Sequence, residues 1–185
     1  RSIPDTTVRL ANLRSGELDM LERLAPTDVK SAQSDKSLKI ESIANLGYQG
    51  ITINTNNGEA ANQPMGKDKR VRQALSLSID RKVLSQVVFE GLYAPSNQPF
   101  NPGNFYVSAD LPVPARDLAK AKALLKEAGQ SKVSVELFVT NNPVDAQLGQ
   151  VIQAMAQEAG IDIQIRSTEF ASQLRDQQQG KFQMS

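Results

Sequence analysis

One stretch of the chain, residues 133–168, restricts the fold more than any other, because its hydrophobic pattern changes period twice. Apolar residues alternate with other residues over 133–139, which predicts a strand. Pro143 opens a helical pattern that stops at Gly160, and alternation returns over 161–165. Two strands joined through a helix in this way are predicted to be parallel, with a right-handed connection. The sequence therefore predicts a fold of the α/β class.

Capping residues and apolar faces predict helices in most of the remaining chain. They cover residues 4–15, 25–34, 68–78, 80–91, 117–128 and 169–179. Further strands are predicted over 17–21, 37–43 and 51–53, with the start of another over 181–185. Residues 54–67 are predicted to form a loop, and so are residues 92–114, which hold five of the nine prolines. The second loop is either an ordered excursion or a flexible segment, and it either serves function or merely wraps the surface.

The chain contains no Cys and no His, and their absence removes whole classes of chemistry. Thiolate nucleophiles, Cys or His metal sites and the Ser-His-Asp triad each need one of these residues. The 21 Lys and Arg residues balance 20 Asp and Glu residues, so no strong field attracts nucleic acid or an acidic membrane. We therefore predict no catalytic residues, no metal site, no cofactor and no nucleic-acid partner.

Two groups of charged residues could be functional or could simply form solvated surface. Glu17 and Asp19 form a carboxylate pair, which could serve acid–base chemistry. Arg70, Arg72, Arg81 and Lys82 could form a phosphate or nucleic-acid patch. Alternation in a short strand would place Glu17 and Asp19 on one solvated face. The basic residues are spread around two helices, so solvated faces explain both groups better. The glycines form no phosphate-binding loop and no dinucleotide fingerprint.

The corner Thr140-Asn141-Asn142, where a strand passes into a helix, is the most informative place for binding. In open α/β sheets ligands bind beyond the carboxyl ends of the strands, where a helix N-terminus also exposes backbone N–H donors. The alternative is that Asn142 simply caps the helix before Pro143. The corner as a whole is predicted to face a ligand, while either role remains open for each residue.

The chain contains no stretch that approaches the roughly 20 apolar residues needed to cross a bilayer, so no membrane span is predicted. It starts at Arg1-Ser2-Ile3-Pro4, which is neither an initiator Met nor a signal peptide. We therefore expect a piece of something longer. The missing cysteines fit the cytosol and the periplasm equally, because a periplasm permits disulfides without requiring them.

Three stretches of the chain carry a family resemblance. They are residues 4–9 with 15–19 (PDTTVR and SGELD), residues 68–76 with 79–81 (DKRVRQALS and IDR), and residues 119–129 (AKAKALLKEAG). In this order and spacing they resemble extracellular solute-binding protein family 5 of bacterial ABC importers. That family handles oligopeptides, dipeptides, glutathione and nickel chelates.

The resemblance implies a receptor of two lobes that closes on its ligand like a hinged trap. It implies that residues 1–185 form a single α/β lobe with the periplasmic binding protein-like (type II) fold, a mixed sheet flanked by helices. This lobe would be most of the C-terminal one, without the N-terminal lobe and the final C-terminal segment. In the family a Gly-Trp-x-x-Asp stretch follows the strand that here ends at Met184-Ser185, so the resemblance implies an incomplete pocket.

The resemblance also implies which residues line the pocket. They are the corner Thr140, Asn141 and Asn142, then Asn45, Gly47 and Tyr48, and the Pro-rich loop around Pro95 and Phe100. Some dipeptide-binding relatives place an arginine for the ligand carboxylate just after this corner. This chain has Asn142, Asp145 and Gln147 there, so a grip by arginine from this lobe is not implied.

The leading hypothesis is a ligand-binding lobe without enzymatic activity, which captures a solute for the membrane permease of an ABC importer. A peptide is the expected solute, with glutathione or a metal chelate as alternatives. The resemblance implies a periplasmic or membrane-tethered extracellular location, with the export signal outside these residues. Two other hypotheses are a cytoplasmic regulator or partner-binding domain that reuses the lobe, and a hydrolase built on Glu17 and Asp19.

Overall fold

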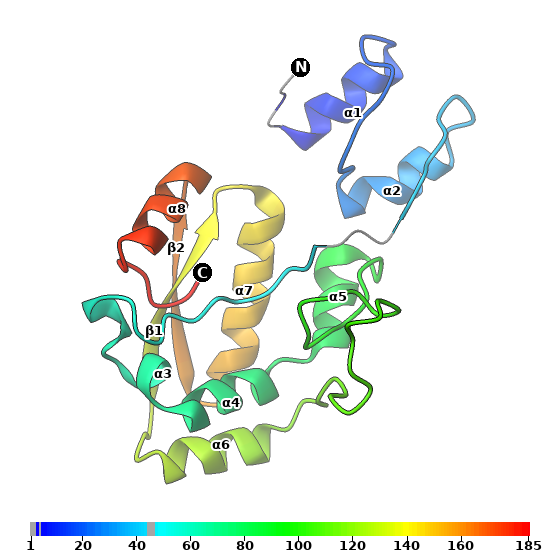
Figure 1. Ribbon diagram of the computed structural model, residues 1–185. Coiled ribbons are helices and arrows are strands. Elements are labelled where there is room, and N and C mark those ends of the chain that lie inside the picture. Colours follow the sequence, from blue (N-terminus) through cyan, green and yellow to red (C-terminus); the bar gives the residue numbers. More distant parts are fainter. Residues whose placement is uncertain (1–2, 4, 44–46) are drawn as a thin grey trace.

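The parallel strand–helix–strand unit lies at the centre of the fold (Figure 1). The computed structural model describes residues 3, 5–43 and 47–185. Strands β1 (Val133–Thr140) and β2 (Ile161–Thr168) pair in parallel along their whole length. Helix α7 (Pro143–Gln157) connects them and packs against both. The predicted strands, their helix and their parallel direction are confirmed.

Two short segments extend this sheet beyond its regular strands. Residues 183–185 lie parallel to β1, where Phe138 N–H donates to Met184 O (2.9 Å) and Met184 N–H donates to Glu136 O (3.1 Å). Residues 52–54 pair with 183–185 in the antiparallel sense. The regular sheet is therefore parallel, and the antiparallel pairing of the mixed sheet that the resemblance implied is limited to an isolated bridge between Ile53 and Met184. The strand predicted over 51–53 and the strand start predicted over 181–185 are each reduced to isolated bridges.

The helices of the α/β body, which we define as residues 51–185, cover both faces of this sheet (Figure 1). Those predicted from the sequence are α4 (Lys69–Ser78), α5 (Arg81–Phe89), α6 (Leu118–Glu127) and α8 (Phe170–Gln178). Helix α4 packs against α6 and α7, whereas α8 contacts β1. The main apolar core includes Val71, Leu75, Leu125, Val133, Val135, Ile152, Ile161, Ile163 and Met184. This core joins the helical stripes to the alternating strand residues, as their spacing predicts.

Phe138 departs from the alternation predicted for β1. Its side chain is only 1% exposed, although its neighbours Leu137 and Val139 belong to the core and successive strand residues face opposite sides. The Arg166 guanidinium lies 4.6 Å from the centre of the Phe138 ring, in a cation–π contact. Both faces of β1 are therefore covered, which a half-exposed strand pattern does not predict.

The arginines of the possible phosphate patch bind backbone carbonyl groups. All three are half-buried, so neither an anion site nor a purely solvated helix face describes them. Arg70 also pairs with the helix cap Asp68 at 2.6 Å, and the hydrogen bonds from Arg70 lower the pKa of Asp68 from 3.8 to about 2. The three carbonyl bonds run from Arg70 to Glu127 (2.8 Å), from Arg72 to Gly66 (2.8 Å) and from Arg81 to Ser76 (3.0 Å).

Two strands predicted near the start of the chain are wrong. After α1 (Thr6–Arg14) the backbone turns, and the N–H groups of residues 17 and 18 donate to Asn12 O. Residues 17–21 and 37–43 are irregular. A strand needs a neighbour for its backbone groups, and in the described part of the chain neither segment has one. Alternation of a few apolar residues was therefore insufficient to predict a strand.

The loop predicted over residues 54–67 holds two short helical pieces that the sequence did not reveal. They are a 3₁₀ turn, Glu59–Ala61, and the single-turn helix α3 (Pro64–Lys67). The side chain of Gln63 caps α3 by accepting from Met65 N–H at 2.7 Å. Glutamine is not among the usual N-cap residues, so this signal was weak.

The Pro-rich loop, residues 92–114, forms no regular element but is held by its own hydrogen bonds. Gln98 organises it: the amide nitrogen donates to Ser108 O (2.9 Å) and Leu111 O (3.1 Å), and the amide oxygen accepts from Ser108 N–H (2.9 Å). Asn97 adds a bond to Pro112 O at 3.1 Å. Of the two readings left open, the ordered excursion is the one observed.

Helices α1 and α2 (Pro26–Gln33) lie beside the α/β body and away from its sheet (Figure 1). Both helices are where the sequence predicts them. The Arg14 guanidinium at the end of α1 donates to Ser31 Oγ on α2 at 2.7 Å, and α2 also contacts α5. Within the described ranges, no helix has the length and apolar character needed to cross a bilayer. The single lobe expected over residues 1–185 stays a prediction.

Candidate ligand-binding corner

The corner predicted from the sequence lies at the carboxyl end of β1, where the strand passes into α7 (Figure 1). Thr140 is the last residue of β1 and is half-buried, whereas Asn141 and Asn142 are exposed. Asn141 N–H donates to Thr168 O at 3.1 Å, which fixes the corner to the end of β2. The local fold thus presents three polar side chains at the end of the sheet.

Asn142 caps α7, as the structural alternative predicted. Its side-chain oxygen accepts from Asp145 N–H at 2.9 Å. Its amide nitrogen donates to the Asp145 carboxylate at 2.7 Å, and the Thr140 hydroxyl donates to the same carboxylate oxygen. Thr140, Asn142 and Asp145 therefore form one hydrogen-bonded cluster that stiffens the corner.

Asp145 completes this cluster, although the predicted site residues did not include it. The sequence carried a signal, because an acidic residue three positions after an N-cap typically returns a bond to the cap. The carboxylate also places a negative charge at the helix N-terminus, which the helix dipole stabilises. The corner combines this charge with amide groups, so it suits a polar or cationic ligand group better than an anion.

Asn141 is the side chain of the corner that remains available. It is exposed, and within the described residues its amide group has no hydrogen-bond partner. Gln147, one turn into α7, donates to Val87 O on α5 at 3.4 Å. The corner is therefore bordered by the last turn of α5, and Asn141 is its free donor and acceptor.

Three of the other predicted pocket residues have no described contact with this corner. Among the described residues, no hydrogen bond or ring contact links it to Tyr48, Pro95 or Phe100. Tyr48 is 65% exposed, and Phe100 is partly exposed with its ring centre 5.2 Å from that of Tyr106. Gly47 is exposed and has a partner of its own. Asn45 lies outside the described residues.

The predicted carboxylate pair lies on the exposed surface. Glu17 and Asp19 are both exposed and lie in an irregular segment, so the strand face that would have aligned them does not exist. The hydrolase hypothesis loses its structural basis. The described residues also contain no group of three or more acidic side chains arranged to hold a metal ion.

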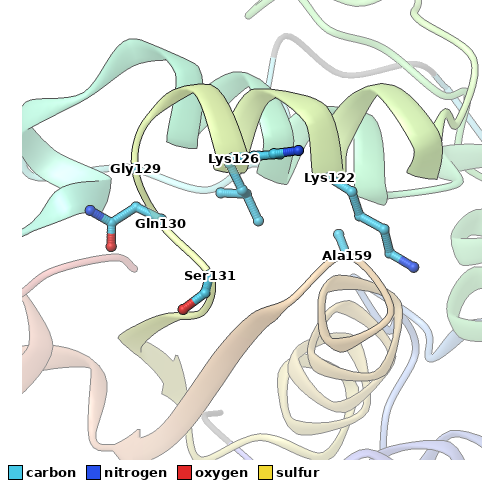
Figure 2. Close-up of a pocket in the computed structure, with 7 residues that line it drawn as sticks. Lys122, Lys126, Gly129, Gln130, Ser131 and Ala159 are labelled. Atoms are coloured by element: carbon cyan, nitrogen blue, oxygen red, sulfur yellow. The ribbon is translucent and has the colours of Figure 1, made fainter.

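Two surface depressions lie away from the corner. One of about 490 Å³ lies between α1 and α2 and involves Leu10, Arg14 and Asp28. The other, of about 280 Å³, lies between the end of α6 and the turn before β2, at the opposite end of the sheet (Figure 2). It is lined by Lys122, Leu125, Lys126, Gly129, Gln130, Ser131 and Ala159. Its two lysines are solvent-exposed, so it offers no enclosed polar site.

Comparison with known proteins shows the family to which the chain belongs. Residues 1–185 match the family model described as "Bacterial extracellular solute-binding proteins, family 5 Middle". The chain belongs to this family. The family 5 chain therefore has the periplasmic binding protein-like fold that the resemblance implied, and the resemblance based on three stretches is confirmed.

Individual relatives of the family 5 chain support this family assignment. It is 32% identical over 183 residues to "Probable di/tripeptide-binding protein 5" of Pseudomonas aeruginosa, covering 96% of this chain and 33% of the relative. It is 27% identical to the "Dipeptide-binding protein" of Escherichia coli, covering 97% of this chain and 34% of the relative. The chain thus spans about a third of the length of these curated relatives.

A solved structure gives the same result. The family 5 chain superposes, with a TM-score of 0.86 and 27% identity, on the ABC transporter-associated periplasmic binding protein DppA from Helicobacter pylori in complex with peptide STSA. The superposition covers 100% of this chain and 35% of that one. The described architecture is therefore that of about a third of a periplasmic binding protein.

Proposed function

We propose that this chain is the ligand-binding portion of a receptor that captures a peptide or similar small solute for an ABC importer. The observation that carries the proposal is the 32% identity to a probable di/tripeptide-binding protein over 96% of the chain. The similarity to a binding protein in complex with peptide STSA adds support. Glutathione or a metal chelate is the alternative solute.

The corner supplies the chemistry that such a ligand needs. A peptide backbone carries N–H and C=O groups that cost free energy when they lose water unpaired. The free amide of Asn141 can serve both kinds of group, because it has donors and an acceptor. The Thr140–Asn142–Asp145 cluster is already arranged, so binding orders few further side chains. The negative Asp145 carboxylate favours the ammonium end of a peptide over its carboxylate.

We further propose that the chain binds and releases without catalysis. The relatives reported above are binding proteins, which favours this role over an enzyme and over a cytoplasmic regulator. A receptor of this kind works with a membrane permease and lies in the periplasm or is tethered outside the membrane.

Titration of the chain with trialanine, followed by NMR, tests the proposal. Because a second lobe would supply much of the ligand burial, we expect a millimolar dissociation constant. Asn141→Ala should weaken binding about fivefold, since one hydrogen bond is worth about 1 kcal/mol. Gln130→Ala, at the opposite end of the sheet, is the matched amide control and should change nothing.

Three outcomes would contradict the proposal or a part of it. Equal affinity in the Asn141→Ala and Gln130→Ala variants would remove the corner from the binding surface. Preferential binding of glutathione or a nickel–histidine chelate would replace the peptide as the solute. Micromolar or tighter binding of trialanine would contradict the expectation of an incomplete pocket.

A further inference from the structure

Asn57 and Gly58 form the one Asn-Gly step in the sequence, and they lie in a bend just before the 3₁₀ turn Glu59–Ala61. A glycine in this place matters chemically, because it has no Cβ to shield its backbone nitrogen from the preceding side chain. That nitrogen can attack the Cγ atom of the asparagine. The bend therefore places a nucleophile and an electrophile on neighbouring residues.

The backbone nitrogen of Gly58 is open to this reaction. Both Asn57 and Gly58 are exposed, so solvent reaches the bond between them. Within the described residues, the Gly58 N–H donates to no other group. A base in the solvent can therefore remove its proton, and no hydrogen bond to this nitrogen has to break first.

The side chain of Asn57, in contrast, is held away from this attack by α8. Its amide nitrogen donates to Gln177 O at 2.9 Å, between two segments that are distant in sequence and lie side by side (Figure 1). The side chain must give up this bond before its Cγ atom can turn to Gly58 N. A hydrogen bond of this kind is worth about a fivefold change in an equilibrium. The native contact therefore slows the reaction without preventing it.

The backbone of Asn57 is anchored as well, by the side chain of Asn54, which is 3% exposed. The Asn54 side-chain oxygen accepts from Asn57 N–H at 2.9 Å. The Asn54 amide nitrogen donates to Asn57 O at 2.7 Å and to Phe182 O at 2.8 Å. Gly180 packs against the same carbonyl, because a Cβ on Gly180 would lie 2.4 Å from Asn57 O. Residue 57 is thus a tight contact point with the C-terminal segment.

We propose that Asn57 is a site of spontaneous modification, at which asparagine is slowly converted to aspartate and isoaspartate. Gly58 N forms a bond to Asn57 Cγ as the Cγ–Nδ2 bond breaks, and the departing NH₂ group takes up the Gly58 proton and leaves as ammonia. Water then opens the cyclic imide at either of its two carbonyl groups, which gives aspartate or isoaspartate without any oxidation or reduction. The bond from Asn57 to Gln177 O sets the rate in the folded chain.

The modification has a structural consequence at the edge of the sheet. Either product lacks the amide group that donates to Gln177 O. Isoaspartate also lengthens the backbone by one carbon, at a point where Gly180 leaves no room for it. We expect the change to weaken the adjoining backbone bonds between residues 52–54 and 183–185.

Incubation of the chain in mildly alkaline buffer, followed by peptide mapping with mass spectrometry, tests the site without any ligand. Aspartate and isoaspartate should accumulate at Asn57 well ahead of Asn56 and Asn141, which are exposed but precede an asparagine. The synthetic peptide of residues 55–61, which lacks the contact with Gln177, should react at least about fivefold faster than the chain. No accumulation at Asn57, or equal accumulation at the three asparagines, would overturn the proposal.

Two glycine variants test whether the fold sets the rate. Gly180→Ala places a Cβ against Asn57 O, so it should disturb the contact and raise the rate toward that of the peptide. The matched control is Gly16→Ala, at a glycine with a similar φ (78° against 69°) and nothing within 4 Å of its Cβ, and it should leave the rate unchanged. Equal rates in the peptide and the parent chain, or an unchanged rate in Gly180→Ala, would contradict the role given to the contact.

Amide hydrogen exchange measures the structural consequence. The N–H groups of Thr52 and Asn54 donate to Ser185 O and Gln183 O, so both should exchange faster in the isoaspartate form than in the parent. The N–H of Val133, which donates to Gly160 O at the opposite end of the sheet, is the control and should exchange at the parent rate. Equal exchange at Thr52 and Asn54 in the two forms would overturn the predicted consequence.

Discussion

The α/β body and the α1–α2 pair, by which we mean residues 5–35, are built from similar helices but are stabilised in different ways. In the body, residues distant in sequence share one core, and Val71, Val133 and Ile163 are at most 1% exposed. In the α1–α2 pair, the buried residues are few and the polar contacts are local. Long-range packing makes the body cooperative, whereas the pair should unfold on its own.

The largest expected effect comes from removing a core side chain in each region. Ile163→Ala should destabilise the body by about 4 kcal/mol, because a fully buried isoleucine leaves a cavity. Leu10→Ala, at a residue 5% exposed in the α1–α2 pair, should leave the main unfolding transition within about 0.5 kcal/mol. Urea unfolding followed by circular dichroism measures both. Equal shifts would show that the pair is an integral part of the body.

A smaller contrast is expected between two glycines with similar backbone conformations. Gly180 (φ 69°) in the body and Gly16 (φ 78°) after α1 both favour glycine. A Cβ at Gly180 would collide with the backbone carbonyl of Asn57, whereas a Cβ at Gly16 would meet nothing within 4 Å.

Gly180→Ala should therefore cost about 3 kcal/mol, from backbone strain and overpacking together. Gly16→Ala should cost about 1 kcal/mol, from backbone strain alone. Thermal unfolding of the two variants distinguishes these contributions. A cost at Gly180 no greater than at Gly16 would mean that the contact between residues 57 and 180 is not tightly packed.

The smallest expected effect is a dependence of stability on pH through Asp68. Hydrogen bonds from Arg70 lower its pKa from 3.8 to about 2. Folding therefore favours the charged carboxylate, whose contribution is present above pH 3.8 and is lost as the pH falls through about 2. Asp68→Asn keeps a capping side chain but lacks this charge.

The difference in unfolding free energy between the parent and Asp68→Asn should shrink as the pH falls toward 2. Asp35→Asn is the control in the other region, because the Ser37 hydroxyl and backbone N–H lower the pKa of Asp35 there. Its effect should be confined to the α1–α2 pair and be absent from the main transition. A parent–variant difference for Asp68 that is independent of pH would contradict the role given to Arg70.

The same contrast explains which elements the sequence could predict. The helix cap at Asp68 and the buried face Val71, Ala74 and Leu75 follow from local spacing, and both are observed. The strands predicted over 17–21 and 37–43 are not formed, because a strand depends on a partner that spacing alone does not reveal. Residues 51–53 pair through Ile53 with Met184, which is far away in the sequence.

The candidate site was predictable in its position but not in its internal contacts. Alternation that stops at Thr140 and a helix that starts at Pro143 place a polar corner at the strand end. The bonds from Thr140 and Asn142 to Asp145 depend on side-chain geometry, so they could not be derived from spacing. The remaining pocket residues were implied by the family resemblance and remain predictions.

Backbone amide mapping during a trialanine titration tests the central claim most directly. If the carboxyl end of β1 binds the ligand, the largest shift changes should occur at residues 140–147 and extend to the last turn of α5. Changes centred on Gly129, Gln130 and Ser131, in the depression at the opposite end of the sheet, would contradict the claim.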